Sequence, residues 1–185
     1  MTFFIEHPTT ALIAGPTGCG KTQFVLNILK ERLISPFPTR IIWVYAEWQP
    51  AYEELRDFLP HIEFMKVIDP EILYDSITPL EINLLILDDQ MMGNFRDDNT
   101  LSKLFTQGSH HRNLSIFYLV QNLFDRGKNH RTVSLNSNLL VLFKNPRDKS
   151  QIRTLASQMY PGNSRFLVEA YEDATIDHLG ILSSI

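Results

Sequence analysis

One stretch of eight residues has the residue types and the spacing that bind a chain of phosphates. It follows the pattern G-x-x-x-x-G-K-T and consists of Gly15, Pro16, Thr17, Gly18, Cys19, Gly20, Lys21 and Thr22. In such a loop the glycines let backbone N–H groups turn toward phosphate oxygens, the lysine reaches the β and γ phosphates, and the threonine hydroxyl binds Mg²⁺. The stretch therefore predicts a site for ATP and Mg²⁺. Cys19 occupies a variable position of the loop, where no chemistry is required of it.

Two aspartates follow a run of four apolar residues later in the chain. Residues 84–87 read Leu-Leu-Ile-Leu, and Asp88 and Asp89 come directly after them. A phosphate loop needs a carboxylate from a neighbouring strand to hold its metal ion, and this run predicts a buried strand that delivers both acids at its carboxyl end. We expect Asp88 to bind Mg²⁺ through water and Asp89 to polarise the attacking water as general base. Glutamate takes the second role more often, so the shorter side chain is a departure.

A polar residue, Gln121, ends another apolar run at residues 114–120. Some P-loop ATPases have an extra strand between the strand that leads into the loop and the strand that carries the acids. A polar residue at the end of that extra strand faces the γ phosphate. Gln121 is therefore predicted to sense hydrolysis. The alternative is a glutamine that only caps the end of a strand.

Apolar runs alternate with segments of helical periodicity, which predicts an α/β fold with a mainly parallel central sheet flanked by helices. The expected strands are residues 10–14, 40–45, 62–67, 84–87, 114–120 and 139–143. The expected helices are residues 21–34, 51–59, 99–108 and 148–159, and residues 122–138 are expected to form a polar loop. Residues 165–171 and 178–182 are predicted to close the fold as a C-terminal pair of strands.

Length and composition set further limits. The chain has 185 residues, 44% of them hydrophobic, and one cysteine. This size suits a single domain, residues 1–185, and the composition is too apolar for a disordered chain. The apolar runs are far shorter than the roughly 18 to 20 residues that span a bilayer, so we expect no membrane contact. Residues 1–8 lack the layout of a signal peptide and one cysteine cannot form an internal disulfide, which together predict an intracellular protein.

Positive charge is concentrated in residues 103–153, which hold nine Lys or Arg against two Asp or Glu, although the whole chain has a net charge of −4. Such a basic stretch can contact a polyanion. The alternative is an ordinary solvated face.

Five short segments around these motifs carry a family resemblance. They are Glu-Trp-Gln-Pro at residues 47–50, Leu-Asp-Asp at 87–89, His-His-Arg-Asn-Leu-Ser at 110–115, Gln-Asn-Leu-Phe at 121–124 and Phe-Lys-Asn-Pro-Arg-Asp at 143–148. Together with the phosphate loop they resemble the DNA-packaging ATPases of poxviruses, giant viruses and Polinton-type elements, which belong to the FtsK-HerA superfamily. The resemblance covers nearly the whole chain, residues 8–183.

The resemblance implies a P-loop NTPase fold of the ASCE, RecA-like type. It also implies a homo-oligomeric ring that pumps double-stranded DNA, whatever its sequence, into a viral capsid with the help of a capsid or portal component. Such a motor would work in the host cytoplasm or nucleus, at sites of virion assembly. The family's nucleotide site falls on residues 15–22, its acidic pair on Asp88 and Asp89, and its sensor on Gln121.

Members of this family also have an arginine finger, which one subunit gives to the ATP of its neighbour. Arg147 is the first candidate, because it follows a predicted strand and Pro146 in a turn that would present it at the edge of the domain. The other candidates are Arg112, Arg126, Arg131 and Arg153.

A packaging motor must hold backbone phosphates without reading bases, so basic loops are expected at its DNA contact. The best candidate is the loop at residues 125–131, which contains Arg126, Lys128, His130 and Arg131. Trp48 either stacks on the base of the nucleotide or packs at the junction between a strand and a helix.

Three other functions fit parts of the pattern. A DNA segregation or transfer ATPase of the same superfamily would share the motifs. A nucleotide-switched assembly protein would keep Lys21 and Asp88 but need no arginine from a neighbour. A small nucleotide kinase has a similar length, but its nucleophile is a bound phosphate, so it needs neither the acidic pair nor Gln121. The acidic pair and Gln121 together argue against the kinase, and the family resemblance makes the packaging motor the first hypothesis.

Overall fold

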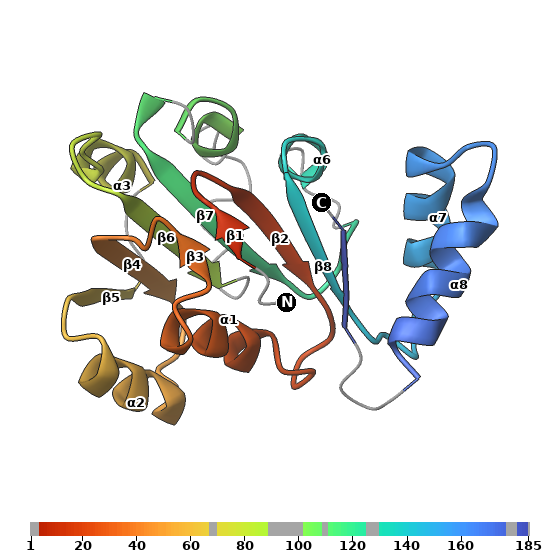
Figure 1. The fold of residues 1–185 in the computed structure, drawn as a ribbon, viewed down its shortest axis with the longest axis horizontal. Coiled ribbons are helices and arrows are strands. Elements are labelled where there is room, and N and C mark those ends of the chain that lie inside the picture. The colour runs from red at the N-terminus through yellow and green to blue at the C-terminus, as the bar shows by residue number, and fades with distance from the viewer. Residues whose placement is uncertain are drawn as a thin grey trace.

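The computed structural model describes residues 4–66, 70–88, 102–108, 111–124, 130–176 and 181–184. Its centre is a sheet of seven strands. These are β2 (Thr10–Ala14), β4 (Arg40–Tyr45), β5 (Ile62–Lys66), β6 (Asn83–Asp88), β7 (Leu114–Val120), β8 (Leu139–Phe143) and β9 (Ile181–Ser184). Their order across the sheet is β5-β4-β6-β7-β2-β8-β9 (Figure 1). All neighbours pair in parallel except β8 and β9, which confirms the predicted mainly parallel α/β fold.

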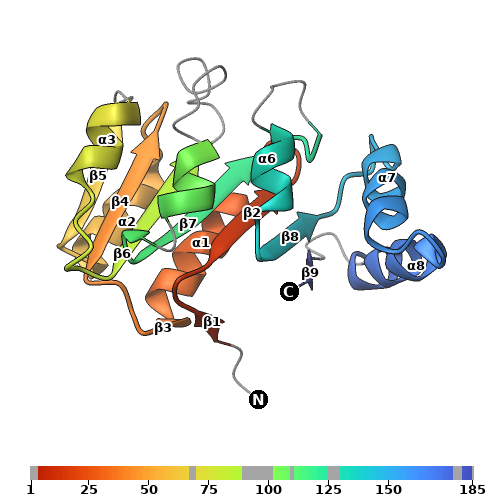
Figure 2. The ribbon, with the colours of Figure 1, turned by 90° about the horizontal axis from the view of Figure 1, so that it is seen from above.

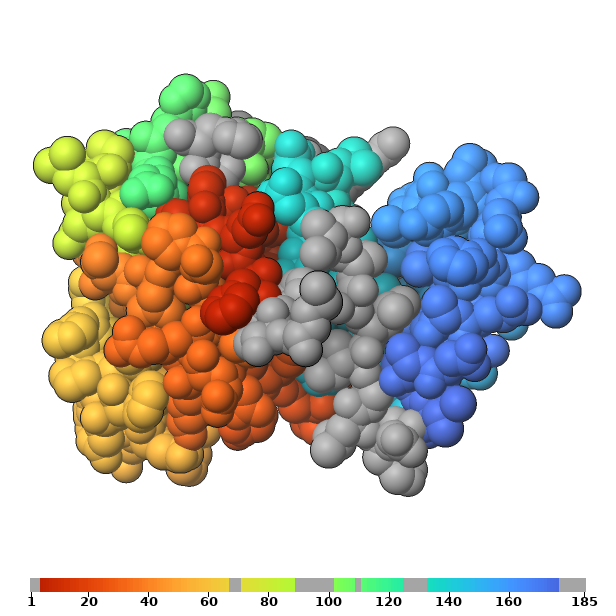
Figure 3. Space-filling model, in the orientation of Figure 1, coloured from red at the N-terminus to blue at the C-terminus, as the bar shows by residue number. Residues whose placement is uncertain are grey.

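Helices cover both faces of this sheet (Figure 2). One face carries α1 (Lys21–Lys30) and α2 (Pro50–Phe58). The other face carries α3 (Pro70–Ser76), the π-helix η2 (Leu104–Gly108) and α6 (His130–Leu135). Beyond β8, α7 (Ser150–Met159) and α8 (Ser164–Ala174) form a lobe at one edge of the molecule (Figure 3). A small second sheet pairs β1 (Ile5–Glu6) with β3 (Ile34–Ser35). Among the described helices, none is both long enough and apolar enough to span a bilayer.

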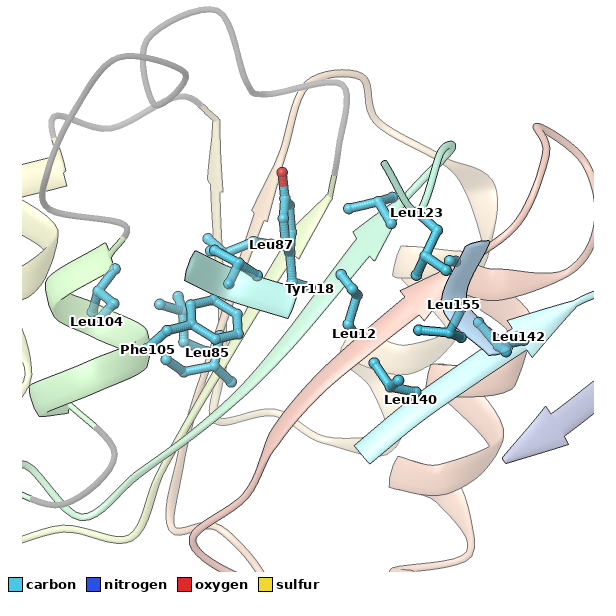
Figure 4. Packing of buried hydrophobic residues seen from close by; sticks show 14 of the residues in the cluster. Leu12, Leu85, Leu87, Leu104, Phe105, Tyr118, Leu123, Leu140, Leu142 and Leu155 are labelled. Atoms are coloured by element: carbon cyan, nitrogen blue, oxygen red, sulfur yellow. The ribbon is translucent and has the colours of Figure 1, made fainter. Parts of the chain in front are cut away.

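The central strands are buried on both sides, because alternate side chains enter two separate cores. In β2, Leu12 and Ala14 pack into one core, whereas Ile13 packs into the other. Figure 4 shows part of the first core, to which β8 contributes Leu142 and α7 contributes Leu155. Burial on both faces explains why these strands appear in the sequence as unbroken apolar runs.

Four of the predicted strands, β2, β4, β7 and β8, have the predicted bounds. The predicted strand at residues 165–171 is wrong, because these residues lie in α8. Leu167 and Tyr171 are its buried residues, and a spacing of four places them on one side of a helix. The closing pair of strands is therefore replaced by β9 alone, which pairs with β8.

Three further differences concern helices. The first predicted helix ends early, at Lys30, and the chain then turns through Arg32, whose φ is +53°. The predicted polar loop at residues 122–138 contains α6, and α3 was not predicted. The predicted helix at residues 99–108 is described only from residue 102 and includes η2.

Candidate nucleotide site

The phosphate loop connects β2 to α1, as the motif predicts. Gly18 has φ +79° and Gly20 has φ +100°, a region in which residues with a side chain are strained. Gly20 directly precedes α1 as its N-cap residue. The loop therefore leads into the positive end of the α1 dipole and its first backbone N–H groups, which is the arrangement that binds phosphate.

Two side chains of the loop turn back onto it. Lys21 Nζ donates hydrogen bonds to the carbonyl oxygen of Gly15 at 2.6 Å and to that of Pro16 at 3.2 Å, which keeps its charge within the loop. Cys19 is half-buried, and burial raises the pKa of its thiol, against an opposing effect of the Lys21 charge. A thiol that stays protonated is a poor nucleophile, which agrees with a packing role for Cys19.

A cleft of about 420 Å³ brings the predicted residues together. It is lined by Thr17, Gly18, Gly20, Lys21, Thr22, Gln23, Gln49, Ala51, Asp88 and Gln121. The sheet explains this arrangement, because β7 lies between β6 and β2. Val120 pairs with Ala14 and Leu119 pairs with Asp88, so the chain leaves β7 between the phosphate loop and the acidic residue. This is the extra strand expected from the sequence, and Gln121 follows it directly.

The donor atoms in the cleft fit Mg²⁺. Thr22 and Asp88 both line it, and they supply a hydroxyl and a carboxylate. Mg²⁺ prefers such oxygen ligands and is held by one or two protein groups together with phosphates and water. In the described ranges no three His, Cys, Asp or Glu side chains cluster as a metal site.

The sequence alone predicts no role for two residues here, one that lines the cleft and one that contacts a residue lining it. Gln49 directly precedes α2 and lines the cleft. Tyr52, in the first turn of α2, is fully buried, and its hydroxyl donates a hydrogen bond to Asp88 Oδ2 at 3.4 Å. Burial, followed by the charge of Asp88, raises the pKa of Tyr52, so the hydroxyl remains a donor. The sequence feature that points to these two residues is the start of α2. This helix begins after the carboxyl end of β4, and β4 lies next to β6, which carries Asp88.

Trp48 lies outside the set of residues that line the cleft. Its ring centroid is 5.4 Å from that of Tyr45, 5.5 Å from that of Tyr52 and 5.3 Å from that of Phe64. The guanidinium of Arg56 lies 5.6 Å from the centre of the Trp48 ring. These contacts favour packing at the strand-to-helix junction over stacking on a base.

The candidate arginines lie in different places. Arg147 is exposed in the turn between β8 and α7, where its backbone N–H donates to Asn145 Oδ1 at 3.2 Å. Arg153 is exposed on α7. Both are therefore exposed in the segment that follows β8.

Arg112 is engaged elsewhere. It donates a hydrogen bond to the carbonyl oxygen of Ile77 at 2.7 Å, and its guanidinium lies 4.0 Å from the centre of the Tyr74 ring. It also precedes the amino end of β7, whereas Gln121 follows the carboxyl end. This position is at the opposite edge of the sheet from the cleft.

Several predicted residues lie outside the part of the chain that the structure describes. Asp89 comes directly after β6, and its role as general base remains a prediction. The DNA contact predicted at residues 125–131 is also a prediction still, because residues 125–129, with Arg126 and Lys128, lie outside the described residues, and of His130 and Arg131 the structure describes only the backbone, at the start of α6.

Comparisons with known sequences give short matches. No family model matches the chain. A segment of 38 residues, 20% of this chain, is 47% identical to Packaging protein 1 of Human adenovirus C serotype 5 and covers 8% of that protein. The corresponding protein of Human adenovirus B serotype 7 is 42% identical over 38 residues, with the same coverage of 20% and 8%. The matched part is therefore less than a tenth of the length of these curated relatives.

Comparisons with solved structures cover most of the chain. The genome packaging NTPase B204 from Sulfolobus turreted icosahedral virus 2, in complex with ATP-gammaS, has a TM-score of 0.60 at 13% identity over 86% of both chains. EssC (ATPases 2 and 3) from Geobacillus thermodenitrificans has a TM-score of 0.56 at 14% identity over 80% of this chain and 34% of that one. The flagellar accessory protein FlaH from Methanocaldococcus jannaschii has a TM-score of 0.54 at 12% identity over 78% and 76%. The chain thus has the P-loop NTPase fold that it shares with a viral genome packaging NTPase, as its motifs predict.

Proposed function

We propose that this chain is an ATP-hydrolysing motor that translocates double-stranded DNA and packages a viral genome into a capsid. The observation that carries this proposal is the single cleft lined by Lys21, Thr22, Asp88 and Gln121, which follow or end three neighbouring strands. The fold shared with B204 and the segment similar to adenovirus packaging protein 1 support packaging as the task.

In this proposal the cleft residues and Asp89 divide the work of hydrolysis. The loop N–H groups and Lys21 hold the β and γ phosphates, and Thr22 and Asp88 hold Mg²⁺, which offsets phosphate charge. The oxygen of a water molecule bonds to the γ phosphorus while the bond to the β–γ bridging oxygen breaks. Asp89 takes the proton of that water, and Gln121 responds to the presence of the γ phosphate.

The remaining roles concern neighbours of the subunit. We assign the arginine finger to Arg147, because it is exposed in a turn next to a core strand. In a homo-oligomeric ring this turn would face the ATP of the next subunit. The basic residues 103–153 would contact DNA phosphates, and a capsid or portal component would hold the ring.

The cleft also weighs against a small nucleotide kinase. Gln121 follows an extra strand between β2 and β6 and lines the cleft together with Asp88. A polar side chain at this place suits a reaction in which water is positioned and hydrolysis is sensed, rather than transfer to a bound phosphate.

The proposal is tested by measuring ATP turnover per subunit over a range of protein concentrations, with and without duplex DNA. We expect turnover to rise with concentration, because a finger in trans works only in an assembly, and to rise further with duplex DNA. Lys21→Ala is the inactive control. Turnover per subunit that neither concentration nor DNA changes would contradict the proposal.

A further inference from the structure

The side chain of Gln151 joins two loops that both belong to the proposed machinery. Gln151 is half-buried in the first turn of α7. Its Oε1 accepts a hydrogen bond from the backbone N–H of Leu123 at 2.7 Å. Its Nε2 donates to Asp148 Oδ2 at 2.8 Å and to Asn122 Oδ1 at 3.3 Å. One amide group therefore uses both its acceptor and its donors to connect the end of β7 with the turn after β8.

The first of these loops begins at the nucleotide cleft. Gln121 lines the cleft, and Asn122 and Leu123 follow it directly. The Leu123 side chain is buried in the same core as Leu155 of α7 (Figure 4). Ile152 of α7 belongs to this core as well. A displacement of Gln121 would therefore move a segment that contacts α7 in two ways, through the packing of Leu123 and through the hydrogen bond from the Leu123 N–H to Gln151.

The second loop carries Arg147. Asp148 Oδ1 accepts a hydrogen bond from the backbone N–H of Ser150 at 3.0 Å, and Asn145 Oδ1 accepts one from the N–H of Arg147. Hydrogen bonds from Ser150 and then from Gln151 lower the pKa of Asp148, so its carboxylate is charged at neutral pH. The bond from Gln151 to Asp148 is thus charge-assisted, and such bonds are stronger than those between neutral groups.

The other end of this turn is anchored to the sheet. The hydroxyl of Tyr171, on α8, donates to the carbonyl oxygen of Phe143 at 3.0 Å and accepts from the backbone N–H of Asn145 at 2.8 Å. These bonds hold the start of the turn, at Asn145, against β8. The other end of the turn, at Asp148, is held by Gln151.

We propose that Gln151 is a positioning residue that couples Gln121 to Arg147 within one subunit. With a γ phosphate beside Gln121, Gln151 holds residues 121–123 and the turn at residues 145–149 in the arrangement that presents Arg147 to a neighbour. Loss of the phosphate releases both loops together. This inference rests on the proposed function and deepens it, because it names the side chain through which the nucleotide of one subunit regulates the arginine that this subunit offers.

Hydrogen exchange of backbone amides, with and without ATPγS and Mg²⁺, tests the coupling without requiring hydrolysis. Three variants are compared with the parent. Gln151→Ala removes all the bonds of the side chain. Gln151→Glu keeps the acceptor for Leu123 but places a second carboxylate beside Asp148. Gln158→Ala is the matched control, because Gln158 is exposed on the same helix.

In the parent, ATPγS should slow exchange in the phosphate loop and also at the amides of Arg147 and Ser150. In both Gln151 variants the response of the phosphate loop should persist, whereas the response at Arg147 and Ser150 should fall about tenfold, as expected for the loss of a bond to a charged group. Gln158→Ala should behave as the parent does. Retention of the loop response in Gln151→Glu also shows that this variant is folded.

Four outcomes would overturn the inference. If the turn responds equally in the parent and in the Gln151 variants, or does not respond in the parent, the coupling is absent while the nucleotide site stands. If the Gln151 variants lose the response of the phosphate loop as well, Gln151 is a structural residue of the whole domain. If ATPγS leaves the phosphate loop of the parent unprotected, the proposed function fails and the inference fails with it.

Discussion

Gly15 and Phe143 approach so closely that a Cβ atom on Gly15 would lie 2.6 Å from the Cβ of Phe143. The Sγ of Cys19 would lie 2.7 Å from this added Cβ atom of Gly15. The start of the phosphate loop is therefore packed directly against the end of β8, the strand that leads into the turn with Arg147. Close approach, and not a left-handed backbone, is the reason for a glycine at this position.

Gly15→Ala should lower the free energy of unfolding by about 1 to 3 kcal/mol, because the backbone of β8 or of the loop must move to admit the methyl group. Gly162→Ala is the control, since no atom lies within 4 Å of the Cβ position there, and it should change stability by less than about 0.5 kcal/mol. Urea denaturation of both variants measures the difference. Equal stability of the two would show that the contact with Phe143 is not tight.

Tyr52→Phe removes the hydrogen bond to Asp88 but keeps the ring, which stacks on Phe64 at a centroid distance of 5.2 Å. We expect ATP turnover to fall about fivefold to tenfold, because a bond to a charged group is lost and Asp88 is then less well oriented. Tyr45→Phe is the control from the same aromatic cluster and should retain the activity of the parent. Steady-state kinetics at saturating ATP and Mg²⁺ compare the variants. Full activity of Tyr52→Phe would show that the Tyr52 hydroxyl has no role at the site.

Lys21→Ala and Asp89→Asn should fail in different ways. Lys21→Ala removes a clamp on the phosphates and should weaken ATP binding as well as abolish turnover. Asp89→Asn removes only the group that polarises water, so it should bind ATP normally and hydrolyse it about 10² to 10³ times more slowly. Binding of a labelled nucleotide and single-turnover hydrolysis separate the two effects. If Asp89→Asn hydrolyses ATP at the rate of the parent, the general base is another residue.

Mixed assemblies test whether Arg147 acts across a subunit boundary. Arg147→Ala and Lys21→Ala should each be inactive alone. A mixture should regain activity, because some interfaces then join an intact phosphate loop to an intact arginine, and a finger in trans is worth about 10³ to 10⁵ in turnover. If Arg147→Ala alone keeps its DNA-stimulated turnover, Arg153, exposed on α7, becomes the next candidate.

The parts of the site that could be predicted from the sequence are those set by short motifs and by the edge of the sheet. Residues 15–22 carry their own pattern, and Asp88 and Gln121 each follow an apolar strand. Parallel strands bring their carboxyl ends to one edge, so three separate motifs meet in one cleft without further information.

Contacts between residues that are distant in the sequence could not be predicted in this way. Tyr52 meets Asp88 only because α2 packs beside β6, and Gln151 meets Leu123 only because α7 follows β8. The prediction of a strand at residues 165–171 is wrong for a different reason, because a short aromatic and aliphatic run occurs in both strands and helices. The burial of Leu167 and Tyr171, four residues apart, is typical of the helix that the structure has there.

The central claim is that ATP hydrolysis by this chain moves duplex DNA. The most direct measurement is displacement of a triplex-forming oligonucleotide from a linear duplex by the parent protein with ATP, with ATPγS, and by Lys21→Ala with ATP. We expect displacement by the parent with ATP only, at the same rate on duplexes of unrelated sequence, since contacts to backbone phosphates do not read bases. ATP hydrolysis by the parent without any displacement would contradict the claim, as would displacement that proceeds equally well with ATPγS.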